Sequence, residues 1–132
     1  MKFFLSVFFI SFVFVSAAQT VTAIDIVQTK PGEFDNYIEF LKKNWVVARE
    51  KAKEKGFIIS FQFIDKRQDS ARDISGDIVL MTEYKDEATY KEREKIFQQI
   101  FKENFPNGPV LVNGKRSKDL ADIKSSNTLK KE

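Results

Sequence analysis

The stretch Phe57-Ile-Ile-Ser-Phe-Gln-Phe-Ile64 decides the fold, because it has the composition of a β-strand with apolar residues on both faces. Successive side chains of a strand point to opposite sides of the sheet. One face then carries Phe57, Ile59, Phe61 and Phe63, and the other carries Ile58, Ser60, Gln62 and Ile64. Both faces need cover, one from helices of the same chain and the other from a partner.

The first residues have the pattern of a secretory signal peptide. Met1-Lys2 precedes an apolar run from Phe3 to Val15, and the small residues Ser16-Ala17-Ala18 follow it. The run is shorter than the roughly 20 residues that a membrane-spanning helix needs. We therefore expect cleavage after Ala18, a secreted or periplasmic protein, and no stable membrane anchor once residues 1–18 are removed.

The composition excludes several classes of function. The chain has neither Cys nor His, which excludes disulfides, thiol chemistry, His-based acid–base catalysis and the usual zinc or haem ligands. Its net charge is only +3, which gives no electrostatic footprint for nucleic acid. We expect no metal, no bound cofactor and no nucleic-acid partner. Catalytic residues, if the protein is an enzyme, stay unassigned.

Start and stop signals predict two helices. Pro31-Gly32 opens the first helix, and Gly56 ends it after a lysine-rich turn. Its apolar residues recur at spacings of three, four and seven, which indicates one buried stripe along about six turns. The stripe contains Phe34, Tyr37, Ile38, Leu41, Trp45, Ala48 and Ala52. Asp86 caps a second helix, which carries a stripe of Ile96, Phe97, Ile100 and Phe101 and ends near residues 104–108.

Strands are predicted at residues 20–28, 57–64 and 77–84, with 110–112 as the best candidate for a fourth. The polar residues 65–75 indicate a long hairpin loop. The resulting order, β-α-β-β-α-β, predicts an α+β protein: a four-stranded antiparallel sheet with both helices on one face, the ferredoxin-like plan. We expect this domain to cover residues 19–113. A charged tail, a helix fragment or disordered, then covers residues 114–132.

The alternation of the strands divides their residues between a helix-covered face and an opposite face. We expect the helices to cover Ile24, Ile26, Phe57, Ile59, Phe61, Phe63, Ile78 and Leu80. The opposite face would carry Ala23, Asp25, Val27, Ile58, Ser60, Gln62, Ile64, Val79, Met81 and Glu83. Leaving its larger apolar residues in water forgoes about 1.5 to 3 kcal/mol each. A homodimer through Ile58, Ile64 and Val79 is the expected cover, and the alternatives are the chain's own tail or a different partner.

The order of three short motifs resembles the dimeric α/β barrel superfamily. They are Lys30-Pro-Gly32 before a long helix, Gly56 before the second strand, and Glu83-Tyr-Lys-Asp-Glu-Ala88 before the second helix. The superfamily includes stress-responsive, antibiotic-biosynthesis-monooxygenase and NIPSNAP-type domains. The resemblance implies a homodimer with a cavity between helices and sheet or between subunits. Its members range from oxygenases and haem-degrading proteins to proteins of no known activity. This chain lacks the His that some members use.

The candidate ligand-cavity residues are polar or aromatic groups expected near that cavity: Asp25, Tyr37, Trp45, Ser60, Gln62, Met81 and Glu83. Tyr37 and Trp45 share the first helix's stripe, where they form either core packing or the aromatic wall of a ligand site. Asp25 and Glu83 share the mixed face. With the first and third strands taken as parallel neighbours, they lie about 13 Å apart at ~3.3 Å per residue, too far for a catalytic carboxylate pair.

Three functions stay open at the level of sequence. The first is a dimeric domain of unassigned activity that binds a small, largely apolar ligand or acts through self-association. The second is a cofactor-free oxygenase-like or isomerase-like enzyme that uses the same cavity. The third is a structural or partner-binding module. A pocket of some 300 Å³ or more, with a carboxylate or Tyr facing it, would favour the first two over the third.

Overall fold

The computed structural model describes residues 19–67 and 77–131, so the expected signal peptide at residues 1–18 lies outside the described residues. Helices and strands follow one another along the chain as β1 (Val21–Thr29), α1 (Phe34–Phe40), η1 (Leu41–Trp45), α2 (Val46–Glu54), β2 (Ile58–Asp65), β3 (Ile78–Tyr84), α3 (Glu87–Lys91), α4 (Arg93–Asn104), α5 (Ser117–Leu120) and β4 (Ala121–Lys130).

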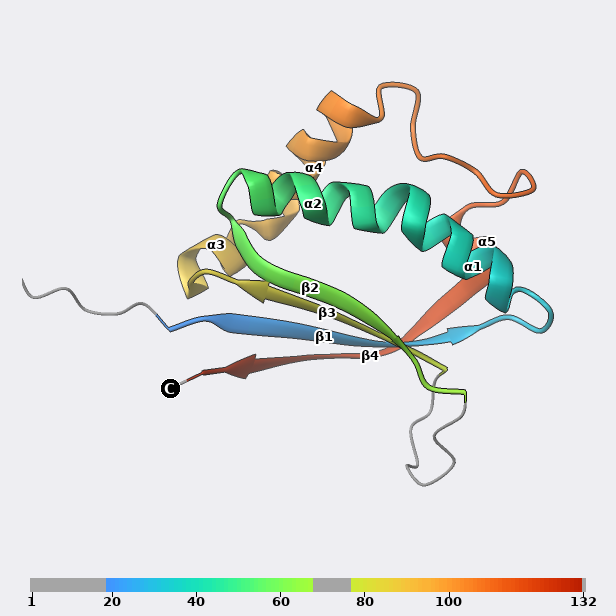
Figure 1. Cartoon of the computed structure of the whole chain (residues 1–132), viewed down its shortest axis with the longest axis horizontal. Helices are drawn as coiled ribbons and strands as arrows, with labels where there is room; N and C mark the ends of the chain where they lie inside the picture. Colours follow the sequence, from blue (N-terminus) through green and yellow to red (C-terminus); the bar gives the residue numbers. More distant parts are fainter. Residues whose placement is uncertain (1–18, 68–76, 132) are drawn as a thin grey trace, which may run out of the picture.

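One four-stranded sheet forms a layer, and helices α1 to α4 lie together on one side of it (Figure 1). The strand order is β2-β3-β1-β4, and every neighbouring pair is antiparallel. This is the α+β, ferredoxin-like plan expected from the order of elements. The expectation that the first and third strands run parallel is wrong, because β3 lies antiparallel between β2 and β1.

The fourth strand is not where the sequence placed it. Val112 makes only an isolated bridge to Lys115, whereas β4 spans Ala121–Lys130 and pairs with β1 along its whole length. The expected domain boundary at residue 113 therefore falls inside the sheet domain. The polar composition of residues 114–132 predicts a helix fragment or disorder, and this prediction is wrong for residues 121–130. An edge strand needs few apolar side chains, since its backbone hydrogen bonds to β1 hold it in place.

The predicted first helix is one continuous helix that contains a π-helical turn. Segments α1, η1 and α2 follow each other without a break, and the Val46 N–H donates to the Leu41 carbonyl, five residues back. The helix ends as expected at Gly56, which has a φ of +78°. There Gly56 N–H donates to Lys53 and Phe57 N–H to Ala52, each over 3.0 Å, the pattern that closes helices at glycine.

Strand β3 shows which face of the sheet the helices cover. Its alternate residues Ile78, Leu80, Thr82 and Tyr84 are all buried on the helix side. In β1, the residues opposite them are Val27, Asp25, Ala23 and Val21, so these four share the helix face. The expected assignment of β1 is therefore reversed: Ile24 and Ile26 lie on the outer face. Apolar residues occupy both faces of β1, and alternation alone does not say which face turns inward.

A bulge in β2 changes which residues of the segment 57–64 face the helices. The register with β3 shifts between Ile58 and Ser60, so the side chains before and after this point do not alternate as in a regular strand. Ile58 is 3% exposed and packs in the core, while Ile59 is 46% exposed. Ile58 is therefore not a dimer-face residue, and Ile59 is not a core residue. Beyond the bulge Phe61 and Phe63 pack beneath the helices as expected.

Candidate functional site

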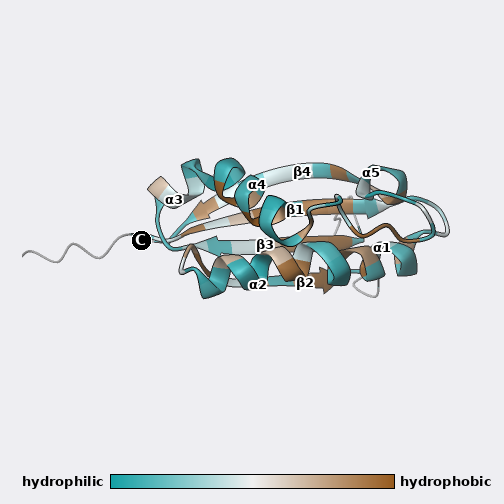
Figure 2. Cartoon of the chain, turned by 90° about the horizontal axis from the view of Figure 1, so that it is seen from above, coloured by the Kyte–Doolittle hydropathy of each residue, from teal (hydrophilic) through white to brown (hydrophobic). Residues whose placement is uncertain are grey.

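A cleft, here termed the interlayer cleft, lies between the helices and the part of the sheet formed by β1 and β4. Figure 2 shows α2 on the β2 side of the sheet and α4 above β1 and β4. The cleft consists of two adjoining pockets of about 520 and 560 Å³. Asp25, Trp45, Arg49 and Leu80 line both pockets. Each volume is in the range of small-molecule sites.

The larger pocket, termed the apolar pocket, is walled by the long helix and by the chain around the end of α4. Its floor includes Leu80 from β3 and Ile123 from β4. Aromatic and aliphatic side chains dominate its lining: Tyr37, Phe40, Leu41, Trp45, Phe101, Phe105 and Pro109. Such a lining suits the apolar body of a small molecule.

The edge strand leaves this cleft open. In β4, Ser126 and Thr128 lie opposite Asp25 and Ala23 and therefore share the helix face. Both are small polar residues, and they line the smaller, more polar pocket. Ile123, at the other end of the cleft, is 63% exposed. Because β4 brings no bulky side chains there, the helix layer does not close against this edge.

Arg49 stands between the two pockets and is held by aromatic rings. Its guanidinium carbon lies 4.8 Å from the centre of the Trp45 ring and 4.0 Å from that of Phe97. Its Nε donates to the Thr82 hydroxyl over 3.3 Å. Burial lowers the pKa of Arg49 from 12.5 to about 10, against the opposing influence of Tyr84 and Asp25. The side chain is therefore a fixed cation at neutral pH.

Asp25 is the second charged group that lines both pockets. It lies on the helix face of β1, opposite Leu80 and Ser126. It influences the pKa of Arg49 electrostatically, yet among the described residues it forms no ion pair with Arg49 and accepts no side-chain hydrogen bond. A half-buried carboxylate without a partner is costly. Its hydrogen-bonding capacity is directed to the space of the cleft.

Two tyrosines of the cleft stay protonated at neutral pH. Burial raises the pKa of Tyr37 from 10.0 to about 12, and the charges of Asp25 and Asp77 act in the same direction. Burial likewise raises the pKa of Tyr84, against the cations Arg49 and Arg93. A hydrogen bond from Ser117 acts against this rise in the pKa of Tyr37. Both hydroxyls thus keep their proton, and neither is suited to act as a base.

The polar pocket has a second arginine at its rim. The Arg93 guanidinium lies 4.1 Å from the centre of the Tyr90 ring, and its Nη1 donates to the Tyr90 carbonyl over 3.0 Å. Glu94 from the same helix also lines this pocket. The pocket therefore combines two cations, two carboxylates and the hydroxyls of β4.

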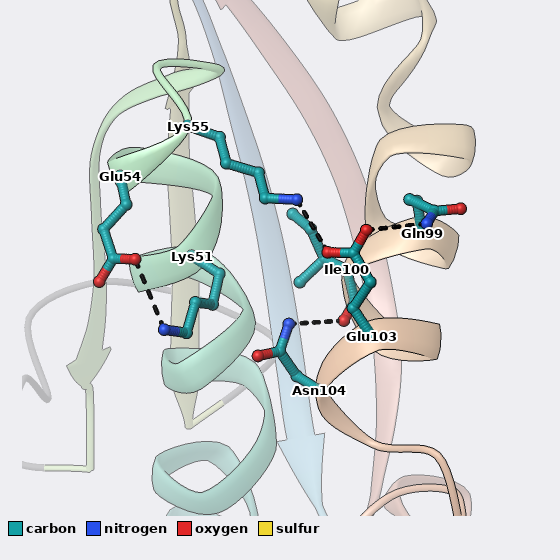
Figure 3. Close-up of polar contacts among 7 residues, drawn as sticks. All are labelled: Lys51, Glu54, Lys55, Gln99, Ile100, Glu103 and Asn104. Atoms are coloured by element: carbon teal, nitrogen blue, oxygen red, sulfur yellow. Dashed lines mark hydrogen bonds and ion pairs between the residues drawn. The ribbon is translucent and has the colours of Figure 1, made fainter.

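Polar contacts join the two helices that wall the cleft (Figure 3). Lys55, just after α2, pairs with Glu103 of α4 over 2.9 Å, and Gln99 donates to the same carboxylate over 2.8 Å. These side chains are exposed, so they contribute little to stability. They link the end of α2 to the last turns of α4.

The rim of the apolar pocket is held by Asn44 of the π-helical turn. Its side chain is 2% exposed. Its Nδ2 donates to the Val110 carbonyl over 2.8 Å, and the Val110 N–H donates to its Oδ1 over 2.7 Å. The loop that contains Gly108 and Pro109 is thereby fixed against the long helix. Turns of π-helix occur frequently at functional sites.

The candidate cavity residues separate into two groups. Asp25, Tyr37 and Trp45 line the interlayer cleft. Ser60, Gln62, Met81 and Glu83 lie on the outer face, where Ser60 donates to Glu83 over 3.3 Å. Asp25 is thus on the helix side of the sheet, contrary to its expected place on the mixed face. Asp25 and Glu83, which the sequence places on one face, therefore lie on opposite faces of the sheet.

Sequence reasoning missed Arg49 and Phe97 as site residues. Phe97 was assigned to a helix stripe without a ligand role. Arg49 follows Trp45 by four residues, so on a helix it lies on the same face as the apolar stripe. A charged residue on the face of such a stripe is the available signal, but by itself it does not distinguish a buried cation from one that extends into solvent.

The described residues contain neither a cluster of metal ligands nor a helix that could span a membrane. No group of three or more Asp, Glu, His or Cys side chains in this part of the chain could hold a metal ion. None of its helices has the length and apolar composition needed to cross a membrane.

Comparison with known proteins gives a likeness of fold. No protein-family model and no curated protein matches the sequence. A dimeric ferredoxin-like protein from an uncultured marine organism aligns with a TM-score of 0.52 and 12% identity, over 86% of this chain and 85% of that chain. A Pseudomonas aeruginosa protein aligns with a TM-score of 0.50 and 12% identity, over 87% and 94% of the two chains.

A protein from Chloroflexus aurantiacus, named after antibiotic biosynthesis monooxygenases, aligns with a TM-score of 0.47 and 13% identity, over 83% of this chain and 90% of that chain. The ferredoxin-like fold expected from the sequence is confirmed by the topology and by the likeness to the marine protein. The chain is a ferredoxin-like α+β domain.

Proposed function

We propose that this protein is an exported homodimer that binds a small, largely apolar molecule in its interlayer cleft. The observation that carries the proposal is the apolar pocket of about 560 Å³, which lies beside a fixed cation. A protein without a ligand gains stability by packing such aromatic side chains against one another. A pocket of this size between the helices and the sheet therefore favours a bound molecule over a purely structural role.

The proposed homodimer uses the outer face of the sheet. Its apolar residues come from three neighbouring strands and lie beside each other in the observed register: Ile24, Ile26, Ile64, Val79 and Met81. Ile64 and Val79 were already expected there. Val79 is already only 7% exposed in the single chain and the other four are half-buried, so covering each of these four is worth less than the roughly 1.5 to 3 kcal/mol of a fully exposed side chain. The marine protein of similar fold is named as dimeric, and a second copy offers the same apolar set in return.

Native mass spectrometry of the protein purified from its own host tests both parts together. We expect a species of twice the mass of the chain that begins at Gln19, with a retained small molecule. A monomer would contradict the proposed dimer. If no molecule is retained and none binds on titration, the ligand proposal is wrong and a structural module is the better reading.

The rival function is a cofactor-free oxygenase-like or isomerase-like enzyme that works in the same cleft. The observation that favours it is Asp25, a carboxylate without a described partner that faces the ligand space. If the retained molecule is converted, Asp25→Asn should abolish turnover while the molecule still binds. Binding without conversion in the wild-type protein would reject this alternative.

A further inference from the structure

We infer that the ligand of the interlayer cleft is an amphipathic carboxylate that carries a hydroxyl group close to its carboxylate. Arg49 would bind the carboxylate, Asp25 would accept the hydroxyl hydrogen bond, and the apolar pocket would hold the ligand's hydrocarbon part. The inference rests on the proposed ligand-binding function and specifies the chemistry of the ligand.

The first step concerns the free donors of Arg49. A guanidinium has five N–H groups, and among the described residues only the Nε group of Arg49 has a protein acceptor, the Thr82 hydroxyl. The guanidinium carbon lies 4.8 Å from the centre of the Trp45 ring and 4.0 Å from that of Phe97, and aromatic rings do not use up the N–H donors that are free for a ligand. The edge of an arginine matches the two oxygens of a carboxylate. Holding the side chain rigid in advance lowers the entropic cost of binding such an anion.

The second step concerns Asp25, whose charge has no direct partner. If Asp25 served only to neutralise Arg49, the two would form an ion pair, because both line the same pockets. They do not. A group that donates to Asp25 and accepts from Arg49 would satisfy both. A carboxylate with a neighbouring hydroxyl has this arrangement.

The third step concerns the direction of the bound molecule. Arg49 and Asp25 lie where the two pockets adjoin, and the polar pocket also contains Arg93 and the β4 hydroxyls of Ser126 and Thr128. The other pocket is mainly aromatic and aliphatic. A polar head at the junction therefore places an apolar chain toward Phe101 and Phe105. A neutral, wholly apolar molecule would leave both charges unsatisfied.

The experiment uses Trp45, the single tryptophan of the chain, as a reporter inside the cleft. Its fluorescence would be titrated with three optically silent ligands of equal chain length: 1-octanol, octanoate and 2-hydroxyoctanoate. We expect octanoate to bind about tenfold or more tightly than octanol, as for one charge-assisted hydrogen-bonded pair. The hydroxyl of 2-hydroxyoctanoate should add about threefold or more, as for one further hydrogen bond.

Variants assign the two effects to the two residues. Arg49→Met keeps an apolar stem between the rings and should remove the advantage of octanoate over octanol. Asp25→Ala should remove the advantage of the hydroxyl and leave octanoate binding intact. Arg67→Met is the matched control, because Arg67 also stacks on an aromatic ring, Phe34, but lies exposed and outside the cleft lining. It should leave all three dissociation constants unchanged.

The outcomes separate the two proposals. If none of the three ligands binds the wild-type protein, the ligand-binding function fails and the inference fails with it. If octanol and octanoate bind equally well, the cleft binds apolar molecules but the inference is wrong. The comparison within the wild-type protein does not depend on the folding of any variant. Should Arg49→Met fail to fold, Arg49→Lys keeps the charge without the planar edge and should lose most of the octanoate preference.

Discussion

At the scale of the residue, Arg49 takes its position from two aromatic rings and one hydroxyl rather than from a carboxylate. This arrangement keeps a cation fixed while its hydrogen-bonding edge stays free. The helical period places Trp45 on the stripe that faces the sheet, where it is half-buried and lines the cleft. The sequence did not identify Arg49, since a charged residue next to a stripe normally extends into solvent.

The raised pKa of Tyr37 should make the free energy of unfolding depend on pH in the alkaline range. Its folded pKa of about 12 lies above the ordinary 10.0, so the folded protein retains a proton that the unfolded chain loses. The stability contributed by the protonated hydroxyl is complete below about pH 10 and is lost as the pH rises toward 12. Between about pH 8 and about pH 11, this alkaline loss should be smaller by about 1.4 kcal/mol in Tyr37→Phe.

Urea denaturation of both proteins at about pH 8 and about pH 11 measures the difference. The lowered pKa of Arg49 acts in the opposite direction, but it is common to both proteins and cancels. An equal alkaline loss in Tyr37→Phe and wild type would show that Tyr37 does not titrate abnormally.

Ile58 and Ile59 form a matched pair of neighbours at the β2 bulge. Ile58 is 3% exposed and Ile59 is 46% exposed. Ile58→Asp should cost about 4 kcal/mol or more, because it buries a carboxylate and removes core packing. Ile59→Asp should change the free energy of unfolding by about 0.5 kcal/mol or less. Chemical denaturation followed by circular dichroism measures both, and similar effects at the two positions would contradict the observed register.

At the scale of the element, the π-helical turn η1 is the feature that joins the fold to the site. It turns Asn44 toward Val110, so that one buried amide satisfies both backbone groups of Val110. No periodic pattern in the sequence distinguishes a π-turn from the α-helix around it. The helix limits, by contrast, were predictable, because Asp86 and Gly56 act within a few residues of themselves.

Asn44→Ala should destabilise the protein by about 2 kcal/mol, because it leaves buried backbone groups without partners. It should also weaken ligand binding, since the loop at the rim of the apolar pocket loses its attachment. Asn104→Ala is the control: within the part of the chain that the structure describes, the Asn104 amide donates only to the Ile100 carbonyl of its own helix. This control should cost about 1 kcal/mol or less. Urea denaturation and Trp45 titration of the two variants provide the comparison, and equal effects would reject the proposed role of Asn44.

At the scale of the whole molecule, the observed register turns one face of the sheet toward the helices and leaves an apolar set on the other. Met81 lies between Ile24 and Gln62 on neighbouring strands of this outer face. If a second copy covers the face, Met81→Asp should raise the dissociation constant of the dimer by about tenfold or more. The folded monomer should persist, because the residue is not part of the core.

Analytical ultracentrifugation measures this dissociation constant, and Leu111→Asp is the control. Leu111 is 45% exposed and lies next to Val110 in a loop outside the four strands. Leu111→Asp should leave the dissociation constant of the dimer unchanged. A Met81→Asp variant that dimerises like wild type would place the interface elsewhere.

The sequence by itself determined the order of elements and the ends of the helices. Because it contains no Cys and no His, it also excluded the chemistry that requires those residues. These properties depend on composition, on helical period and on residues close to each other in the chain. The tertiary structure decided which face of β1 turns inward, where β2 bulges and which segment supplies β4. Alternation sorts the residues of a strand into two sets, but only pairing with neighbouring strands orients them. The cleft that contains Asp25 and Arg49 follows from that orientation.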